Sequence, residues 1–324
     1  MSVTAAWTNT ILDAASPSDA WRTIFDHLLD LAQTTSSPVE LHNQTKTPDR
    51  LIAESAWELW HAYTESAPRT SHELAAWWSQ NSGGAGKAVL VLDALSLREL
   101  RAILAAAEAR GIQPTNVRVT GVEVPSTTDQ FAKALGAGTR GGLKNNTPPS
   151  GFVLSAGGVY TDVVSYPFQD CLGSVPSDKN VVLWHTWLDD LIHVQKRLPD
   201  QIYKTAQAEL QSDGFWAFVD RLRQGRRLVI TSDHGYAVGK LFSTQEKDDA
   251  VVAALREVFG ASRYESDSRV WAHRLMPPLV TTQNGHHIVM GQRKWKVQGG
   301  FPHVDHGGLT LLEVGVPLVE LRAV

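Results

Sequence analysis

Aspartate and histidine side chains follow two apolar runs of this 324-residue chain, each at the point where the run ends. The run Leu228 to Ile230 leads into Asp233 and His234, and the run "VLVL" leads into Asp93. A turn after a buried strand ordinarily favours Gly, Asn or Ser, so two adjacent metal-binding residue types are unusual there. On this stretch alone, an equal alternative is that Asp233 caps a helix and His234 lies on the surface.

Two further segments carry the same residue types at spacings that suit a shared site. In "WLDDLIH", Asp189 and His193 are four residues apart, about one helical turn, so both can face the same point. In "FPHVDHGG", His306 precedes two glycines, which would let the backbone approach closely. A solvated helix face and an ordinary loop are the alternatives for these two segments.

A hydroxyl group completes this set of side chains. The segment "VEVPSTTDQ" ends a strand and opens a helix, and it places Thr128 near a helix N-terminus suited to bind an anion. Thr127 and Thr128 are also ordinary helix-cap candidates, as is Asp93.

The elements that must position these residues alternate between strands and helices from residue 87 onward. Apolar runs at 87–95, 115–124, 151–166, 180–186 and 226–235 predict strands, and helical spacing predicts helices at 98–111, 129–136, 187–223 and 247–260. This alternation predicts an α/β fold with a mostly parallel sheet sandwiched by helices. Residues 1–82 show helical spacing without strand signals, which predicts a small N-terminal helical region. Residues 83–324 form a second predicted region, which contains the sheet.

Composition excludes several classes of protein. Lys plus Arg is 30 and Asp plus Glu is 34, a formal net charge of -4, so the chain lacks the global basic field of many nucleic-acid or lipid binders. Cys171 is the single cysteine, which excludes an internal disulfide and a Cys-based zinc site. No run of 18 apolar residues occurs, and the N-terminus lacks a signal-peptide pattern. We therefore expect a cytoplasmic protein that does not bind membranes.

In open parallel sheets, ligands bind beyond the carboxyl ends of the strands, where most of these residues are predicted to lie. Carboxylates and imidazoles without thiolate, beside a hydroxyl nucleophile and an anion-binding helix start, suit a two-metal phosphoryl-transfer site. Mixed oxygen and nitrogen ligands suit Zn²⁺ and Mn²⁺ alike.

The chain resembles a PglZ domain, a branch of the alkaline phosphatase superfamily, over about residues 87–324. Four ordered blocks carry the resemblance, "VLVLDALSLREL", "EVPSTTDQF", "WHTWLDDLIH" and "VITSDHGY", and a fifth, "VDHGGLTLLEVGVPLVEL", closes it. The fifth is the most specific block, because the family closes with His-Gly-Gly, an acidic residue and a strand of Val-Pro-Leu-Val type.

The resemblance implies two divalent metal ions, most readily zinc, and a role for each residue. One metal would be held by Asp189, His193 and His306, and the other by Asp93, Asp233 and His234, with Thr128 between them as nucleophile. The family pattern favours Thr128 over Thr127, but the two are adjacent, and Thr127 is expected to contact substrate. His185 matches a recurring family histidine and is expected to touch substrate or a metal ligand.

The implied reaction is attack by Thr128 on phosphorus, which gives a phospho-threonine that water then hydrolyses. Relatives imply phosphodiester substrates, nucleotides or oligonucleotides, in bacterial phage defence of the BREX type, with protein partners from the defence system, or in nucleotide signalling. Phosphomonoester hydrolysis and a non-catalytic scaffold or signalling module are the alternatives.

Overall fold

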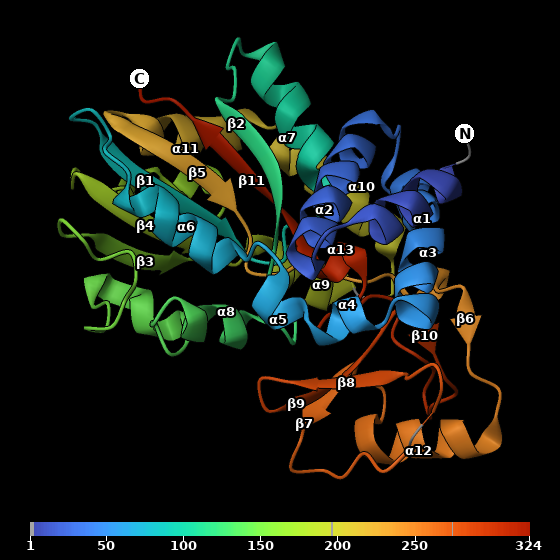
Figure 1. Cartoon of the computed structure of the whole chain (residues 1–324). Helices are drawn as coiled ribbons and strands as arrows, with labels where there is room; N and C mark the ends of the chain where they lie inside the picture. Colours follow the sequence, from blue (N-terminus) through green and yellow to red (C-terminus); the bar gives the residue numbers. More distant parts are fainter. Residues whose placement is uncertain (1–2, 196, 274) are drawn as a thin grey trace.

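The computed structural model describes residues 3–195, 197–273 and 275–324, and a six-stranded sheet lies at its centre (Figure 1). The strand order is β2-β11-β5-β1-β4-β3. β11 runs antiparallel to both of its neighbours, whereas β1 is parallel to β4 and β5, and β3 is parallel to β4. The predicted fold class, a mostly parallel sheet between helices, is confirmed. The bounds are β1 (Gly86–Leu92), β2 (Asn116–Gly121), β3 (Tyr160–Val164), β4 (Asn180–His185), β5 (Arg226–Thr231) and β11 (Gly315–Leu321).

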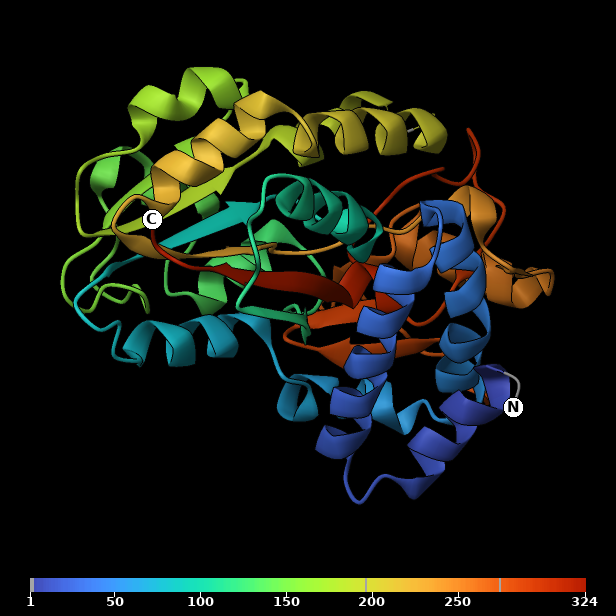
Figure 2. The same ribbon diagram turned by 90° about the horizontal axis from the view of Figure 1, so that it is seen from above.

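Both faces of the sheet are covered, which explains why β1 reads as a continuous apolar run. Along β1, Leu90 joins a large hydrophobic cluster on one face, and Val89 and Val91 join a second cluster on the other. Figure 2 shows α11 (Asp213–Arg223) over one face and α6 (Thr70–Ser79) over the other. α7 (Leu97–Ala109) packs into the first cluster, and α8 (Thr128–Ala134) into the second.

The N-terminal residues form helices, as predicted, and they share the core of the sheet. Ser16 and Ser37 cap α2 (Pro17–Thr34) and α3 (Pro38–Ser55), each with proline in the first turn. α1 (Val3–Asp13), α4 (Glu58–His61) and α5 (Tyr63–Ser66) complete the region. Trp21 and Trp60 are fully buried, so these tryptophans pack in the core rather than form a surface.

The predicted helical stretch 187–223 is three helices in the structure, α9 (Trp187–Gln195), α10 (Pro199–Leu210) and α11. Leu198 precedes a proline, and its φ of -125° and ψ of 64° are not helical, so helical geometry is interrupted before α10 begins. The side chain of Ser212 accepts a hydrogen bond from the Phe215 amide and starts α11.

Residues 244–294 form a smaller unit beside the carboxyl edge of the sheet (Figure 1). α12 (Asp249–Phe259) packs with a three-stranded sheet of β7 (Tyr264–Ser266), β9 (His286–Val289) and β8 (Val280–Gln283), and β6 (Thr244–Gln245) pairs with β10 (Arg293–Lys294). The segment "QNGHH" forms a hairpin turn, in which Asn284 and Gly285 have φ of 50° and 75° between β8 and β9. The remaining short elements are the 3-10 helices η1 (Arg140–Asn146), η2 (Phe168–Ser174) and η3 (Gly239–Leu241), and α13 (Leu311–Val314). Within the described ranges, we find no helix with the length and apolar character to span a bilayer.

Candidate metal centre

The sheet brings the predicted Asp and His residues to its carboxyl edge, as parallel strands should. Asp93 directly follows β1, and Asp233 and His234 follow β5. Because β11 runs antiparallel, its beginning lies at this same edge, and His306 precedes it along the chain. The rings of His234 and His306 stack with centroids 4.2 Å apart. Three segments distant in sequence therefore meet at one point.

Thr128 lies in the middle of this group, at the first residue of α8. Its Oγ1 donates a hydrogen bond of 2.7 Å to Asp233 Oδ2, and it lies 3.4 Å from both Asp93 Oδ1 and His234 Nε2. His234 Nε2 is also 3.6 Å from Asp93 Oδ1 and 3.5 Å from Asp233 Oδ2. The hydroxyl is thus surrounded by two carboxylates and one imidazole.

The two stacked imidazoles are held in the same tautomer by backbone carbonyls. His234 Nδ1 lies 2.9 Å from Gly235 O, and His306 Nδ1 lies 3.2 Å from Ser126 O. A carbonyl oxygen only accepts hydrogen bonds, so each Nδ1 carries a proton and Nε2 is the nitrogen of each ring that can offer a lone pair to a metal. Histidine metal ligands are oriented by outer contacts of this kind.

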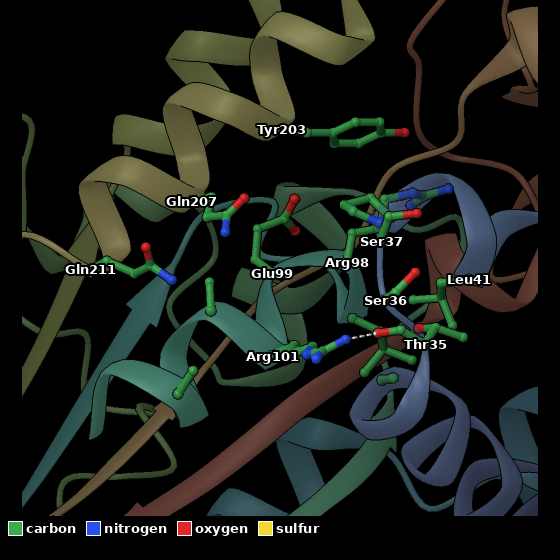
Figure 3. Close-up of a pocket in the computed structure, with 15 residues that line it drawn as sticks. Thr35, Ser36, Ser37, Leu41, Arg98, Glu99, Arg101, Tyr203, Gln207 and Gln211 are labelled. Atoms are coloured by element: carbon green, nitrogen blue, oxygen red, sulfur yellow. Dashed lines mark hydrogen bonds between the residues drawn. The ribbon is translucent and has the colours of Figure 1, made fainter. Parts of the chain in front are cut away.

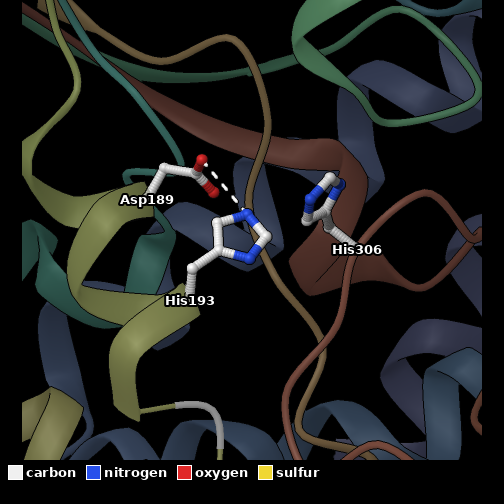
Figure 4. A group of neighbouring side chains, drawn as sticks. All are labelled: Asp189, His193 and His306. Carbon is white, nitrogen blue, oxygen red and sulfur yellow. Dashed lines mark ion pairs between the residues drawn. The ribbon is translucent and has the colours of Figure 1, made fainter.

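Asp189 and His193 form the other side of the group, on α9 (Figure 4). Asp189 Oδ2 is 3.4 Å from His193 Nε2, whereas Asp189 Oδ1 is buried and has no hydrogen-bond donor in the described structure. Asp189, His193 and His306 each offer a ligand atom within 4.8 Å of one another. Asp189 does the same with Asp93 and His234. Asp189 therefore lies between two potential metal positions, whereas the family resemblance implied that it binds only one metal.

The carboxylates at this edge are electrostatically unfavourable without a cation. Burial, followed by the charge of Asp233, raises the pKa of Asp93 well above its usual range. Burial raises the pKa of Asp233 to about 6. Burial and the neighbouring His234 lower the pKa of His306 to about 4, so its ring is neutral. Grouped carboxylates, imidazole nitrogens and a buried carboxylate oxygen without a donor fit divalent cations.

Two glycines after His306 allow the close approach that the sequence predicted. Gly307 has a φ of +100°, and a Cβ there would lie 2.3 Å from the Tyr264 ring. A Cβ on Gly308 would lie 2.3 Å from Arg263, which forms a buried ion pair with Glu313. Larger residues would displace the loop that carries the histidine.

Sequence analysis missed two residues that contact Asp93. Arg140 of η1 forms an ion pair through Nη1 with Asp93 Oδ2, and its side chain is 31% exposed. Trp184 of β4 donates a 3.1 Å hydrogen bond to the same oxygen. The loop around Arg140 carries no periodic signal, so no pattern could place its side chain here. Trp184 precedes His185, and strand alternation could have assigned their side chains to opposite faces.

His185, unlike the other predicted site residues, serves the hydrophobic core. Its Nε2 lies 3.0 Å from Tyr166 O, its Nδ1 accepts a bond from the Trp187 amide, and its ring stacks on Phe168 at 4.2 Å. Both ring nitrogens are therefore occupied, which leaves the expected contact with substrate without support. Thr127 is the buried N-cap residue of α8, and its side chain makes no capping hydrogen bond.

No protein-family model and no curated protein matches this sequence. Among solved structures, murine ectonucleotide pyrophosphatase/phosphodiesterase 5 is similar over 73% of this chain and 88% of its own, with 12% identity and a TM-score of 0.44. Phosphonoacetate hydrolase from Sinorhizobium meliloti is similar over 74% and 91%, with 14% identity and a TM-score of 0.40. Human ectonucleotide pyrophosphatase/phosphodiesterase 5 has 11% identity and a TM-score of 0.41, over 73% and 88%. These likenesses are distant, and the chemistry of the site follows from its own side chains.

Proposed function

We propose that this protein is a metal-dependent phosphodiesterase that holds two divalent cations, Zn²⁺ or Mn²⁺, and uses Thr128 as its nucleophile. The observation that carries the proposal is Asp189, whose buried Oδ1 lacks a donor while its carboxylate belongs to both groups of potential ligands. A buried carboxylate oxygen without a hydrogen-bond donor is costly unless a cation accompanies it.

The residues would divide between two metal positions. Asp189, His193 and His306 would hold one cation, and Asp93, Asp233 and His234 the other, with Asp189 close enough to contact both positions. Bound divalent cations would stabilise negative charge on the attacking and leaving oxygens of an in-line displacement.

The contacts of Thr128 support its proposed role as the nucleophile. Thr128 Oγ1 donates its proton to Asp233 Oδ2, with 2.7 Å between the two oxygens. The lone pairs of Oγ1 are therefore free to face a phosphorus atom. In the proposed reaction the Oγ1–P bond forms, one ester P–O bond breaks, and the alcohol leaves with a proton. Water then attacks phosphorus, which restores the Thr128 hydroxyl and releases the phosphomonoester product. Arg140, beside Asp93, would supply a positive charge to the phosphoryl oxygens.

The substrate we favour is a nucleotide or oligonucleotide phosphodiester, and the biological setting is PglZ-type phage defence. The resemblance of the five sequence blocks supports this setting, with protein partners from a defence system and a cytoplasmic location. Thr127 would line the substrate side of the nucleophile.

A substrate screen tests the proposal. Purified protein, supplied with Zn²⁺ or Mn²⁺, should hydrolyse bis(4-nitrophenyl) phosphate faster than 4-nitrophenyl phosphate, and a chelator should abolish turnover. Faster monoester hydrolysis would identify a phosphomonoesterase instead. Absence of turnover in protein with verified bound metal would favour a non-catalytic module.

A further inference from the structure

A cavity of about 230 Å³ lies between α7, α10 and the loop that joins α2 to α3 (Figure 3). Its lining residues include none of the Asp and His residues of the candidate metal centre. Tyr203 and Gln207 of α10 and its C-cap residue Gln211 are spaced four residues apart and therefore share one side of the helix. Arg98 and Arg101 of α7 form the opposite wall, three residues apart. The cavity is thus a separate site, lined by both polar and apolar side chains, at the junction of the N-terminal helices with the sheet region.

The buried end of this cavity holds two polar atoms without protein partners. Arg98 is 6% exposed and Tyr203 is 8% exposed. Within the described residues, neither Arg98 Nε nor Tyr203 Oη has a hydrogen-bond partner. The two side chains are close enough for the charge of Arg98 to oppose the effect of burial on the pKa of Tyr203. A polar contact between the Tyr203 hydroxyl and the Arg98 guanidinium also lowers the pKa of Tyr203, but this contact does not meet hydrogen-bond geometry.

The orientation of Arg98 is fixed from one side. Its Nη1 donates bonds of 3.1 Å to Ser96 Oγ and 2.6 Å to Tyr236 O, and its guanidinium lies 4.8 Å from the centre of the Tyr236 ring. These contacts leave the edge of the guanidinium formed by Nε and Nη2 without a hydrogen-bond partner among the described residues. That edge is one of the forks with which arginine binds carboxylate or phosphate through two parallel hydrogen bonds.

The charge of the cavity lining favours an anion. Arg98 and Arg101 supply two positive charges. Arg101 is exposed at the open side of the cavity, where its Nη1 donates a hydrogen bond to the Thr35 carbonyl. Glu99 also lines the cavity, but its carboxylate accepts bonds from the Tyr236 hydroxyl at 2.6 Å and from the Ser96 amide at 3.1 Å. Burial also raises the pKa of Glu99 to about 7, so its negative charge is only partly present at neutral pH.

We infer that this cavity binds a small molecule that carries a carboxylate or phosphate group. The anionic group is held by the free edge of Arg98, with Arg101 and the Tyr203 hydroxyl beside it, and Gln207 and Gln211 bind further polar atoms. The volume is below the roughly 300 to 1,000 Å³ typical of sites for drug-sized ligands, which favours a metabolite-sized anion. This inference does not depend on the proposed phosphodiesterase activity.

Isothermal titration calorimetry with succinate and with inorganic phosphate tests the inference and separates the two anion types. We expect saturable binding of at least one probe at one site per chain. Arg101→Gln and Tyr203→Phe should each weaken it at least roughly tenfold, since each removes a hydrogen bond to a charged group. The Tyr203 hydroxyl is unpartnered and the exposed Arg101 makes one hydrogen bond, to the Thr35 carbonyl, so both variants should fold and differ little from the wild type in melting temperature. Arg22→Gln, which removes an exposed arginine of α2 outside the cavity lining, is the matched control and should bind as the wild type does.

Two results would overturn the inference. One is the absence of binding of either anion to the wild-type protein at millimolar concentration. The other is binding that both Arg101→Gln and Tyr203→Phe leave unchanged, because such binding would belong to another site, such as the surroundings of Arg140.

Discussion

Thr128 Oγ1 lies 2.7 Å from Asp233 Oδ2, although the two residues are 105 positions apart in the chain. The hydrogen bond joins the start of α8 to the end of β5, two elements that reach the same edge of the sheet. Asp233 also accepts a 3.1 Å bond from the Ala94 amide, next to Asp93. The nucleophile candidate is therefore oriented by the same carboxylates that are proposed to hold metal.

Replacement of the Thr128 hydroxyl should remove catalysis without loss of fold or metal. We expect Thr128→Ala to lower phosphodiester turnover by at least about 10²-fold, because the attacking oxygen is gone. Thr127→Ala should be mild, since Thr127 is the extended N-cap residue of α8 and its side chain makes no capping hydrogen bond. Turnover rates with matched melting curves and metal content are the measurement. Inactivation by Thr127→Ala alone would move the nucleophile by one residue.

Arg140 forms an ion pair with Asp93 and should therefore compete with a cation for that carboxylate. Arg140→Gln should raise the affinity for Zn²⁺ or Mn²⁺ several-fold, because it frees Asp93 Oδ2 and removes a positive charge from the cluster. The same variant should lower turnover, as the proposed contact with phosphoryl oxygens is lost. Metal titration calorimetry measures the first effect, with Arg22→Gln as control. An affinity equal to or below that of the wild type would show that Arg140 does not oppose the cation.

His193 should determine the number of bound ions. Its side chain is 62% exposed, so His193→Ala removes a ligand with little effect on packing. We expect two divalent ions per wild-type chain and one per His193→Ala chain, measured by elemental analysis after dialysis. The exposed His61 offers a matched control, and His61→Ala should retain both ions. Equal stoichiometry in all three proteins would remove His193 from the ligand set.

Asp49 should make stability depend on pH. This residue of α3 is fully buried, and burial raises its pKa from 3.8 to about 7. The folded state therefore keeps a proton that the unfolded chain releases, so this contribution to the free energy of unfolding is full below about pH 4 and falls as pH rises toward 7.

Asp49→Asn should flatten this dependence. The Asp49 carboxylate accepts bonds from the Leu311 amide and from Gln292 Nε2, while Gln292 Oε1 is buried without a partner. An asparagine amide can donate to Gln292 Oε1 once the glutamine amide turns over. The variant should be more stable than the wild type at pH 8 by on the order of 1 kcal/mol, and similar at pH 4. Denaturant melts from pH 4 to 8 measure it, and parallel curves for the two proteins would contradict the assignment.

The sequence predicted the parts of the site that follow from local pattern and strand direction. Asp93, Asp233 and His234 were predictable because apolar runs mark where strands end, and parallel strands end at one edge. Asp189 and His193 were predictable from their helical spacing, but the position of Asp189 between two ligand groups depends on how α9 packs.

Other features required the tertiary structure. Arg140 reaches Asp93 from the short 3-10 helix η1, whose sequence has no periodicity, and His185 is the last residue of β4 yet faces Phe168 in the core. The cavity at Arg98 and Tyr203 forms where helices from three parts of the chain meet, so neither residue carries a signal in its own segment.

Anomalous diffraction from crystals grown with Mn²⁺ or Zn²⁺ tests the central claim most directly. We predict two anomalous peaks about 3.5 to 4 Å apart. One should lie within bonding distance of His193 and His306, and the other within bonding distance of Asp93 and His234. The Asp189 carboxylate should lie between them. A map without a peak at this edge, at saturating metal concentration, would contradict the two-metal account.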